Sequence, residues 1–304
     1  MNNIIEIKNL TKSYGEVKAV QDVSFTVREG EMFAFLGVNG AGKSTTINIM
    51  CTTLAKDSGK IFIDGTDIDN DALSVKNKIG VVFQSSVLDR ALTVKDNLEH
   101  RASLYGITGE AFKQRLDELS DTFDFKDLLG RTLGKLSGGQ KRRIDIARAL
   151  IHKPKILILD EPTTGLDPQT RKLIWDTVND MRKKENMTVF LTTHYMEEAA
   201  EADYVVIIDS GRIVAKGTPL ELKNTYTDDY ITLYNADEEA VKKLSPNYSA
   251  VKNGYRITVP NTESATSLIV NNREAFIDYE ITKGKMDDVF LAVTGKNLTG
   301  GDSK

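Results

Sequence analysis

The residues best suited to chemistry lie in a glycine-rich run between the apolar segment 33–36 and a helix-like stretch at 47–50. Its glycines allow consecutive backbone N–H groups to turn toward a polyphosphate, while Lys43 adds a cation and Ser44 offers a hydroxyl to Mg²⁺. A plain glycine turn is the alternative, but the flanking elements and the Lys–Ser pair favour a phosphate site. The candidate binding residues are Gly37, Asn39, Gly40, Ala41, Gly42, Lys43, Ser44 and Thr45.

Two carboxylates, Asp160 and Glu161, follow the apolar segment 156–159. If that segment is a strand of an open α/β sheet, the pair lies at its carboxyl end, where such sheets bind ligands. Asp160 is then placed to hold Mg²⁺, and Glu161 to act as general base on the attacking water. An acidic pair by itself is also typical of a helix cap or a solvated edge. The glycine-rich run in the same chain favours the catalytic interpretation.

A third group lies in the segment 136–140, and here the chain resembles the ATPase subunits of ABC transporters. Other motifs of that family follow in its order: Gln84 ends 82–84, Asp167 ends 165–167, and His194 follows 191–193. The resemblance covers about residues 4–220. It implies an α/β fold of the P-loop NTPase type, with a mostly parallel core sheet, an antiparallel β subdomain and a helical insert. It also implies ATP and Mg²⁺ as cofactors.

The resemblance further implies roles for the motif residues. Glu161, His194, Gln84 and Lys43 are expected in catalysis, and Ser44, Gln84 and Asp160 around Mg²⁺. Gln84 is also expected to contact the membrane partner. His194 alone would more often be an ordinary packed or surface histidine.

The same resemblance extends the ATP contacts beyond the glycine-rich run. Tyr14 is expected to stack on adenine, although an isolated tyrosine at this place is more often an ordinary turn residue. Ser137 could be a plain helix N-cap, since 141–150 is helix-like; in the family both readings hold. The further ATP-binding candidates are Tyr14, Ser137, Gly138, Gly139, Gln140 and Asp167.

The elements that must position these residues follow from the pattern of apolar residues. Strand and helix signals alternate from residue 1 to about 220, with buried strands expected at 156–159, 188–191 and 204–208. A helical insert is expected at about 90–150. A small α+β domain follows at 221–298, with strands at 229–233, 255–259 and 275–281 and a helix at 262–271. The polar tail 299–304 is expected to fray.

Composition narrows the class of protein. The formal net charge of −4 leaves no excess of basic residues for a nucleic-acid backbone, so no nucleic-acid partner is expected. No apolar run approaches the roughly 20 residues that cross a bilayer. The chain begins with a strand-like pattern rather than a secretory signal, and its one cysteine fits a reducing compartment. These features fit a protein of the cytoplasm, and the resemblance to ABC transporter ATPases implies the cytoplasmic face of the cell membrane, where a permease would hold it.

Two segments indicate the branch of the family. The sequence at 79–98 and the C-terminal segment 286–291 resemble those of drug- and antibiotic-export ATPases of the daunorubicin-resistance type. Such subunits pair with a separately encoded integral membrane permease. Because the family shares each ATP between two ATPase subunits, a head-to-tail homodimer, or a pair with a related ATPase, is expected.

Other functions stay open at this point. An importer, or an exporter of lipid, polysaccharide or sodium, would use the same ATPase motifs, because the permease lines the transport path. A soluble ABC ATPase of translation or DNA repair fits less well: there is one cassette, and only about 50 residues separate Gln84 from Leu136, too few for a coiled coil. A P-loop kinase would leave the segment 136–140 without a purpose.

Overall fold

The computed structural model describes residues 2–296, and contacts within the chain divide it into two compact units. Among the described residues, the first unit contains 2–194 and 202–213, and the second contains 195–201 and 214–296. The division falls inside strand β10 (Arg212–Gly217). The domain boundary placed at residue 220 from the sequence stays a prediction.

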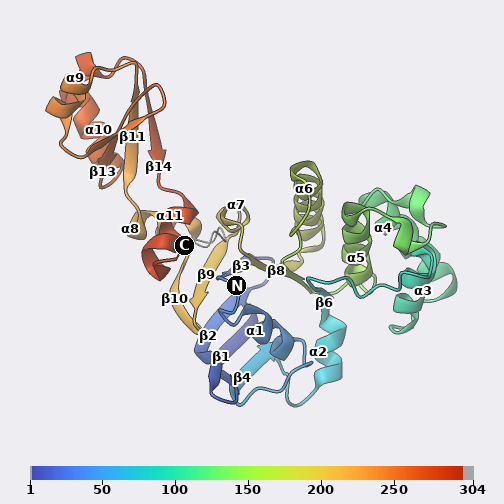
Figure 1. The fold of residues 1–304 in the computed structure, drawn as a ribbon. Coiled ribbons are helices and arrows are strands. Elements are labelled where there is room, and N and C mark those ends of the chain that lie inside the picture. The colour runs from blue at the N-terminus through green and yellow to red at the C-terminus, as the bar shows by residue number, and fades with distance from the viewer. Residues whose placement is uncertain (1, 297–304) are drawn as a thin grey trace. The chain divides into compact units, whose positions relative to one another are not determined.

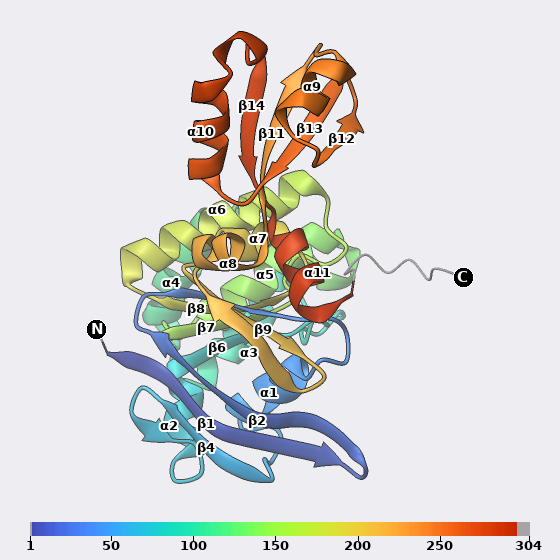
Figure 2. The same ribbon diagram turned by 90° about the vertical axis from the view of Figure 1, so that its left-hand side faces the viewer.

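The first unit begins with an antiparallel sheet. Strands β1 (Asn3–Tyr14), β2 (Val17–Arg28), β4 (Ser58–Ile63) and β5 (Thr66–Asp67) are arranged in the order β2-β1-β4-β5. Figure 2 shows β1, β2 and β4 of this sheet. Gly15 makes the tight turn between β1 and β2 with a φ of 58°, in the left-handed region that favours glycine. Three strands therefore precede the first helix, and the predicted alternation of strand and helix is wrong before residue 43. The reason is that half-buried antiparallel strands can be joined by short turns, without a crossover helix.

The second sheet carries the site. Its order is β10-β9-β3-β8-β7-β6, with β3 (Met32–Leu36), β6 (Ile79–Val82), β7 (Ile156–Asp160), β8 (Thr188–Thr193) and β9 (Tyr204–Asp209). Strands β9, β3, β8, β7 and β6 pair in parallel, as the short fully apolar runs predicted. The predicted strands at 156–159, 188–191 and 204–208 are confirmed. Phe33 stacks between Phe25 and Phe190, at ring-centroid distances of 5.1 and 5.2 Å, and joins the two sheets in one core.

Helices complete the first unit (Figure 1). Helix α1 (Lys43–Met50) follows β3, and α2 (Ala72–Lys78) precedes β6. The predicted helical insert contains α3 (Val94–Ser103), α4 (Gly109–Thr122) and α5 (Gly138–Leu150), with short 3₁₀ turns at Lys126–Leu128 and Leu133–Lys135. Phe112, Leu116 and Leu119 form the buried stripe of α4. Helix α6 (Pro168–Glu185) connects β7 to β8.

The second unit holds α7 (Met196–Ala200), α8 (Pro219–Tyr226) and α11 (Met286–Thr294), together with a four-stranded antiparallel sheet. The sheet order is β12-β13-β11-β14, from Tyr248–Val251, Gly254–Val259, Asp229–Tyr234 and Tyr279–Lys283. Helices α9 (Glu238–Leu244) and α10 (Thr262–Asn271) cover one face, through Val241 and Ala265 (Figure 2). The predicted helix at 262–271 is confirmed.

One strand of this unit was predicted out of place. The apolar pattern suggested a strand at 275–281, but Arg273–Ala275 forms a 3₁₀ turn and the strand runs from Tyr279 to Lys283. The Ala275 N–H donates to the carbonyl of Asn272 at 2.9 Å, so the chain is still turning where the strand was expected. Phe276 is buried as part of the core cluster and not as a strand residue. Helix α9 and strand β12 were not foreseen, and the predicted frayed tail at 299–304 lies outside the described residues.

No helix within residues 2–296 combines the length and the apolar character needed to cross a membrane.

The single cysteine provides a test of the first unit's core. Cys51 follows α1, is 4% exposed, and burial raises the pKa of its thiol to about 12. At pH 8 about one thiol in 10⁴ is then ionised, so we expect a thiol-specific reagent to leave native protein unlabelled. Denatured protein should take up one equivalent per chain. Rapid labelling of native protein, with the circular dichroism of the fold intact, would contradict the buried position.

Candidate active site

The glycine-rich loop forms a cradle between β3 and α1. Gly40 and Gly42 have φ values of 82° and 109°, which only glycine adopts without strain. A Cβ on Gly42 would overlap the carbonyl oxygen of Ala19 on β2, so the loop also packs tightly. No side chain caps the start of α1, and its first backbone N–H groups and positive dipole end face the loop. The predicted loop residues therefore form an anion-binding concavity at a helix N-terminus.

Lys43 lies over this cradle. Its Nζ donates to the carbonyl of Gly37 at 2.7 Å and of Val38 at 3.2 Å. The residue is 4% exposed, and burial lowers the pKa of its ammonium, an effect that the nearby Glu161 and Asp160 oppose. A buried cation held at the mouth of an N–H cradle is suited to polyphosphate.

Asp160 ends β7 next to the start of α1. The Ser44 hydroxyl donates to its Oδ2 at 3.4 Å, and the Thr192 hydroxyl on β8 donates to its Oδ1 at 2.6 Å. Burial raises the pKa of Asp160, and the Thr192 hydrogen bond opposes that rise. The Ser44 and Asp160 oxygens are hard ligands lying side by side, which fits a Mg²⁺ that also binds phosphate. Thr192 was not foreseen from the sequence, because a threonine inside a buried strand gives no signal by itself.

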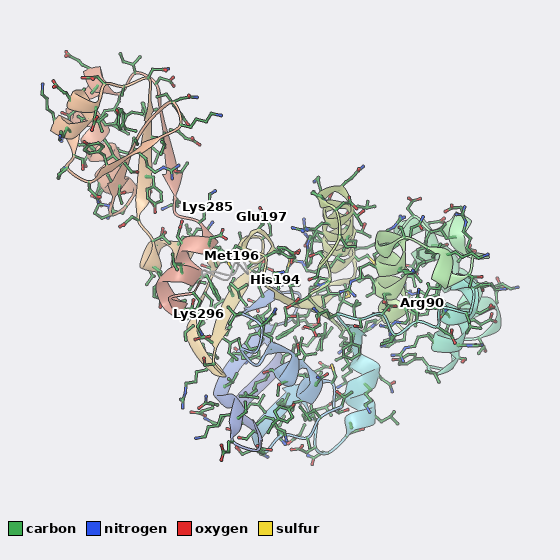
Figure 3. All side chains as sticks on the ribbon, in the orientation of Figure 1. Arg90, His194, Met196, Glu197, Lys285 and Lys296 are labelled. Atoms are coloured by element: carbon green, nitrogen blue, oxygen red, sulfur yellow. The ribbon has the colours of Figure 1, made fainter. Side chains whose placement is uncertain are left out.

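Glu161 is the point at which the other candidate residues meet. Its carboxylate lies 3.7 Å from Lys43 Nζ and 3.2 Å from His194 Nδ1, and it accepts hydrogen bonds from Gln84 Nε2 at 3.3 Å and Thr164 Oγ1 at 3.4 Å. His194 directly follows β8 (Figure 3). The structure thus brings together Lys43, Gln84, Glu161 and His194, which are far apart in the sequence.

The backbone of Glu161 is unusual as well. Its φ of 46° is in the left-handed region, and its N–H donates to the carbonyl of Thr192 at 3.1 Å. For a non-glycine residue this conformation costs about 1–2 kcal/mol. Such strain is typical of a functional site, where the surrounding structure fixes a side chain in a needed direction.

A cavity of about 250 Å³ lies between the loop and Glu161. Its walls include Asn39, Gly40, Gly42, Ser44, Thr45, Gln84 and Glu161, together with Lys43. Ala19 of β2 also lines it and was not predicted, since nothing in the local sequence connects it to the loop. A larger cavity of about 620 Å³ lies in the second unit, beside α9 and α10. Its lining charges are mixed in sign and it lacks a glycine-rich loop, so the chemistry points to the smaller cavity.

Comparison with known proteins agrees with this geometry. Residues 20–164 match the protein family described as ABC transporter. The daunorubicin resistance ATP-binding protein DrrA2 of Streptomyces coeruleorubidus is 33% identical, over 99% of this chain and 98% of that protein. The chain belongs to the ATP-binding proteins of ABC transporters. The doxorubicin resistance ATP-binding protein DrrA of Mycobacterium tuberculosis is 37% identical, over 95% and 93%. The Nod factor export ATP-binding protein I of Ralstonia nicotianae is 33% identical, over 97% and 95%.

Solved structures of ABC ATPases share the fold. The cbiO1 subunit of Clostridium perfringens, part of an ABC transporter complex, superposes with a TM-score of 0.67 and 30% identity, over 73% of this chain and 91% of that one. The ATP-binding cassette MJ0796, described as a dimer in a post-hydrolysis state with ADP and Pi, gives 0.66 and 28%, over 70% and 98%. The predicted α/β fold of the P-loop ABC type is confirmed, and the chain is an ABC ATPase.

Several predicted site residues of this ABC ATPase lie away from the cavity. Ser137 and Gly138 are exposed at the start of α5, where the Ser137 hydroxyl accepts from Gln140 N–H at 3.2 Å and the Gln140 side chain accepts from Ser137 N–H at 3.0 Å. This is a complete capping box, so Ser137 is the N-cap of α5, as the alternative interpretation of this residue predicted. Tyr14 is 50% exposed at the end of β1, with Lys12 Nζ 5.7 Å from its ring centre.

Asp167 caps α6 next to the start of α5. It accepts from Thr170 N–H at 2.9 Å and from the Thr170 hydroxyl at 2.6 Å, and these hydrogen bonds lower the pKa of Asp167. A Cβ added to Gly139 would lie only 2.7 Å from Thr170 Cγ2, so the two helix starts pack closely. The predicted residues 137–140 and 167 therefore form a second cluster within the chain, separate from the cavity.

Two glycine variants separate backbone strain from close packing in the loop. Gly40→Ala adds a Cβ that meets nothing within 4 Å, whereas Gly42→Ala drives one into the Ala19 carbonyl, and both positions have positive φ. We expect Gly40→Ala to lower the free energy of unfolding by about 1–2 kcal/mol. Gly42→Ala should lower it by a further 1–3 kcal/mol or so and abolish ATP binding. Urea unfolding and fluorescent-nucleotide binding would measure both, and equal losses for the two variants would contradict the tight approach.

Proposed function

We propose that this ABC ATPase hydrolyses Mg-ATP to power a separately encoded membrane permease that exports drugs, antibiotics or related compounds. The observation that carries the catalytic part is the convergence of Lys43, Gln84 and His194 on the carboxylate of Glu161. An acid that faces a phosphate cradle and is held by three polar groups is positioned to accept a proton from water.

The proposed mechanism assigns each group a step. ATP lies with its β- and γ-phosphates in the loop 37–45, where Lys43 offsets their charge. Mg²⁺, held by Ser44 and Asp160 with Gln84 beside them, would neutralise charge on the phosphate oxygens during transfer. Glu161 accepts a proton from the attacking water, whose oxygen bonds to the γ-phosphorus as the bond to the β-phosphate oxygen breaks. His194 and Gln84 hold the Glu161 carboxylate in the direction required. Tyr14 is assigned to the adenine.

Each site needs a second copy. The second cluster, at the start of α5 with Asp167, does not line the cavity of its own chain, yet it presents a hydroxyl and helix N–H groups. In the proposed head-to-tail dimer, residues 137–140 of one subunit complete the ATP site of the other. A pair with a related ATPase would use the same surface. The net charge of −4 does not favour a nucleic-acid partner, and the permease would hold the dimer at the cytoplasmic face of the membrane.

The cargo is proposed from the relatives. Two that match over nearly their full length are named for daunorubicin and doxorubicin resistance, and a third for Nod factor export. Because the match with these resistance and export proteins includes the C-terminal unit, we favour an exporter over an importer. Cargo choice within that class belongs to the permease.

The general base is tested by Glu161→Gln, which keeps the size of the side chain and removes its charge. We expect turnover to fall by about 10² or more, while nucleotide binding persists. Steady-state ATPase assays and binding of a fluorescent ATP analogue would measure the two effects. Glu99→Gln on the exposed surface of α3 is the matched control and should leave turnover unchanged. Near-normal turnover in Glu161→Gln would remove Glu161 from the mechanism.

The same variant tests the shared site, because it stops the reaction after ATP has bound. Light scattering should show Glu161→Gln protein shifting from monomer to dimer when Mg-ATP is added. The additional variant Ser137→Ala should weaken that shift, since it removes the hydroxyl proposed to contact the second ATP. A protein that binds ATP and stays monomeric would mean that the permease, or another ATPase, is needed to align the two halves.

A further inference from the structure

Side chains of helix α5, and of His152 just after its end, form a series of hydrogen bonds to the edge strand β6. Arg148 Nη2 donates to the carbonyl of Val81 at 2.6 Å, and His152 Nε2 lies 3.1 Å from the carbonyl of Ile79. Since a carbonyl only accepts, His152 must carry its proton on Nε2. These carbonyls are two residues apart on β6, so they point to the same side, the edge that no strand covers in the described sheet.

Arg142 makes the third hydrogen-bonded contact of this series. Its Nη1 donates at 2.6 Å to the carbonyl of Phe83, the next carbonyl of the same alternating series. The rest of its guanidinium turns to the end of β7: Nη2 donates to Glu161 O at 3.0 Å and to Asp160 O at 3.3 Å, and Nε donates to the carbonyl of Pro162. One side chain thus bonds four carbonyls, and these belong to or directly flank Gln84, Asp160 and Glu161.

The bonds of Arg142 are of the kind that fix geometry. Its side chain is 9% exposed, so the donors face little competition from water. The guanidinium is planar, so its donors are held in a fixed fork, which a lysine ammonium cannot reproduce. Close packing supports the same contact, because a Cβ on Gly80 of β6 would overlap the carbonyl of Ala149 on α5. Helix α5 and the strand that leads to Gln84 therefore form one stiff body.

The position of Arg142 along α5 gives this contact a consequence. Arg142 lies two residues after Gln140, within the first turns of the helix whose exposed start is proposed to contact the ATP of a second subunit. A shift of that helix start displaces the backbone of Arg142, whose guanidinium is bound to four carbonyls. Its four acceptors include the backbone of the general base and the residue before Gln84.

We propose that Arg142 is a positioning residue that couples the two ATP sites of the dimer: engagement of residues 137–140 by one ATP aligns Gln84 and Glu161 at the other. This inference rests on the proposed function. It assigns to the segment 137–140 a second role, in which the segment acts on the site of its own subunit as well as on that of its partner.

The variant Arg142→Lys keeps the positive charge and removes the planar, forked arrangement of N–H donors. We expect the turnover number to fall about 10- to 100-fold, as for a small displacement of reacting groups, with binding of the fluorescent ATP analogue within about 2-fold of wild type. Arg143→Lys is the matched control, because the neighbouring arginine bonds Phe123 and Asp124 and no residue of the cavity. Its turnover should stay near wild type. Equal losses in both variants, or loss of ATP binding together with turnover in Arg142→Lys, would overturn the assignment.

The coupling between the two ATP sites is measured with a double-mutant cycle of Ser137→Ala and Arg142→Lys. Ser137→Ala should lower the turnover of the wild-type chain more than that of the Arg142→Lys chain, because the path between the sites is already broken. If the two effects multiply, the residues act independently and the coupling is wrong. An inactive wild-type chain in the same assay would instead contradict the proposed function.

A measurement without substitution at Arg142 covers the case in which Arg142→Lys fails to fold. Hydrogen exchange of Glu161→Gln protein, with and without Mg-ATP, should show protection rising together in residues 137–143 and 79–84. Protection confined to the start of α5 would overturn the proposed coupling.

Discussion

The site depends on burying four charges at the end of one strand. Lys43, Asp160, Glu161 and Arg142 are each at most 9% exposed around the carboxyl end of β7. Charges taken out of water are costly unless they are paired and hydrogen-bonded, and here each finds partners: carbonyls for the cations, hydroxyls and an amide for the acids. The signs also balance, two against two. A γ-phosphate and Mg²⁺ would enter a site whose own charges are already arranged.

This constraint explains why the parallel sheet is built as it is. Strands β3, β7 and β8 lie side by side in the order that puts Leu36, Asp160 and Thr193 at one edge. The loop, the acid pair and His194 follow from those three strand ends. The left-handed conformation of Glu161 and the tight approach of Gly42 to Ala19 are the local costs of that convergence. The antiparallel sheet contributes through β2, whose Ala19 forms a wall of the cavity.

Sequence patterns predicted what is local and missed what is formed by distant parts. The loop 37–45 and the acids after β7 could be predicted because strand, turn and helix signals lie next to them in the chain. Ala19, Thr192 and Arg142 could not, because each acquires its partners only when strands or helices far apart in sequence meet. The misplaced strand at 275–281 has the opposite cause. Of its large apolar residues only Phe276 is buried, whereas Ile277, Tyr279 and Ile281 are exposed. Phe276 reaches the core from a turn, which alternation alone does not distinguish from a strand.

The start of α5 shows how one residue can serve both structure and the proposed chemistry. As N-cap, the Ser137 oxygen accepts from Gln140 N–H and uses one lone pair. Its hydroxyl hydrogen is a separate group, so it can donate to a phosphate oxygen without breaking the cap. The N–H groups of Gly138 and Gly139 belong to the first turn, which has no partners within the helix. Capping thus fixes the direction of the donors proposed for the second ATP. In the proposed coupling, the fork of Arg142, about one turn further along, carries a displacement of that helix start to the backbone of Glu161.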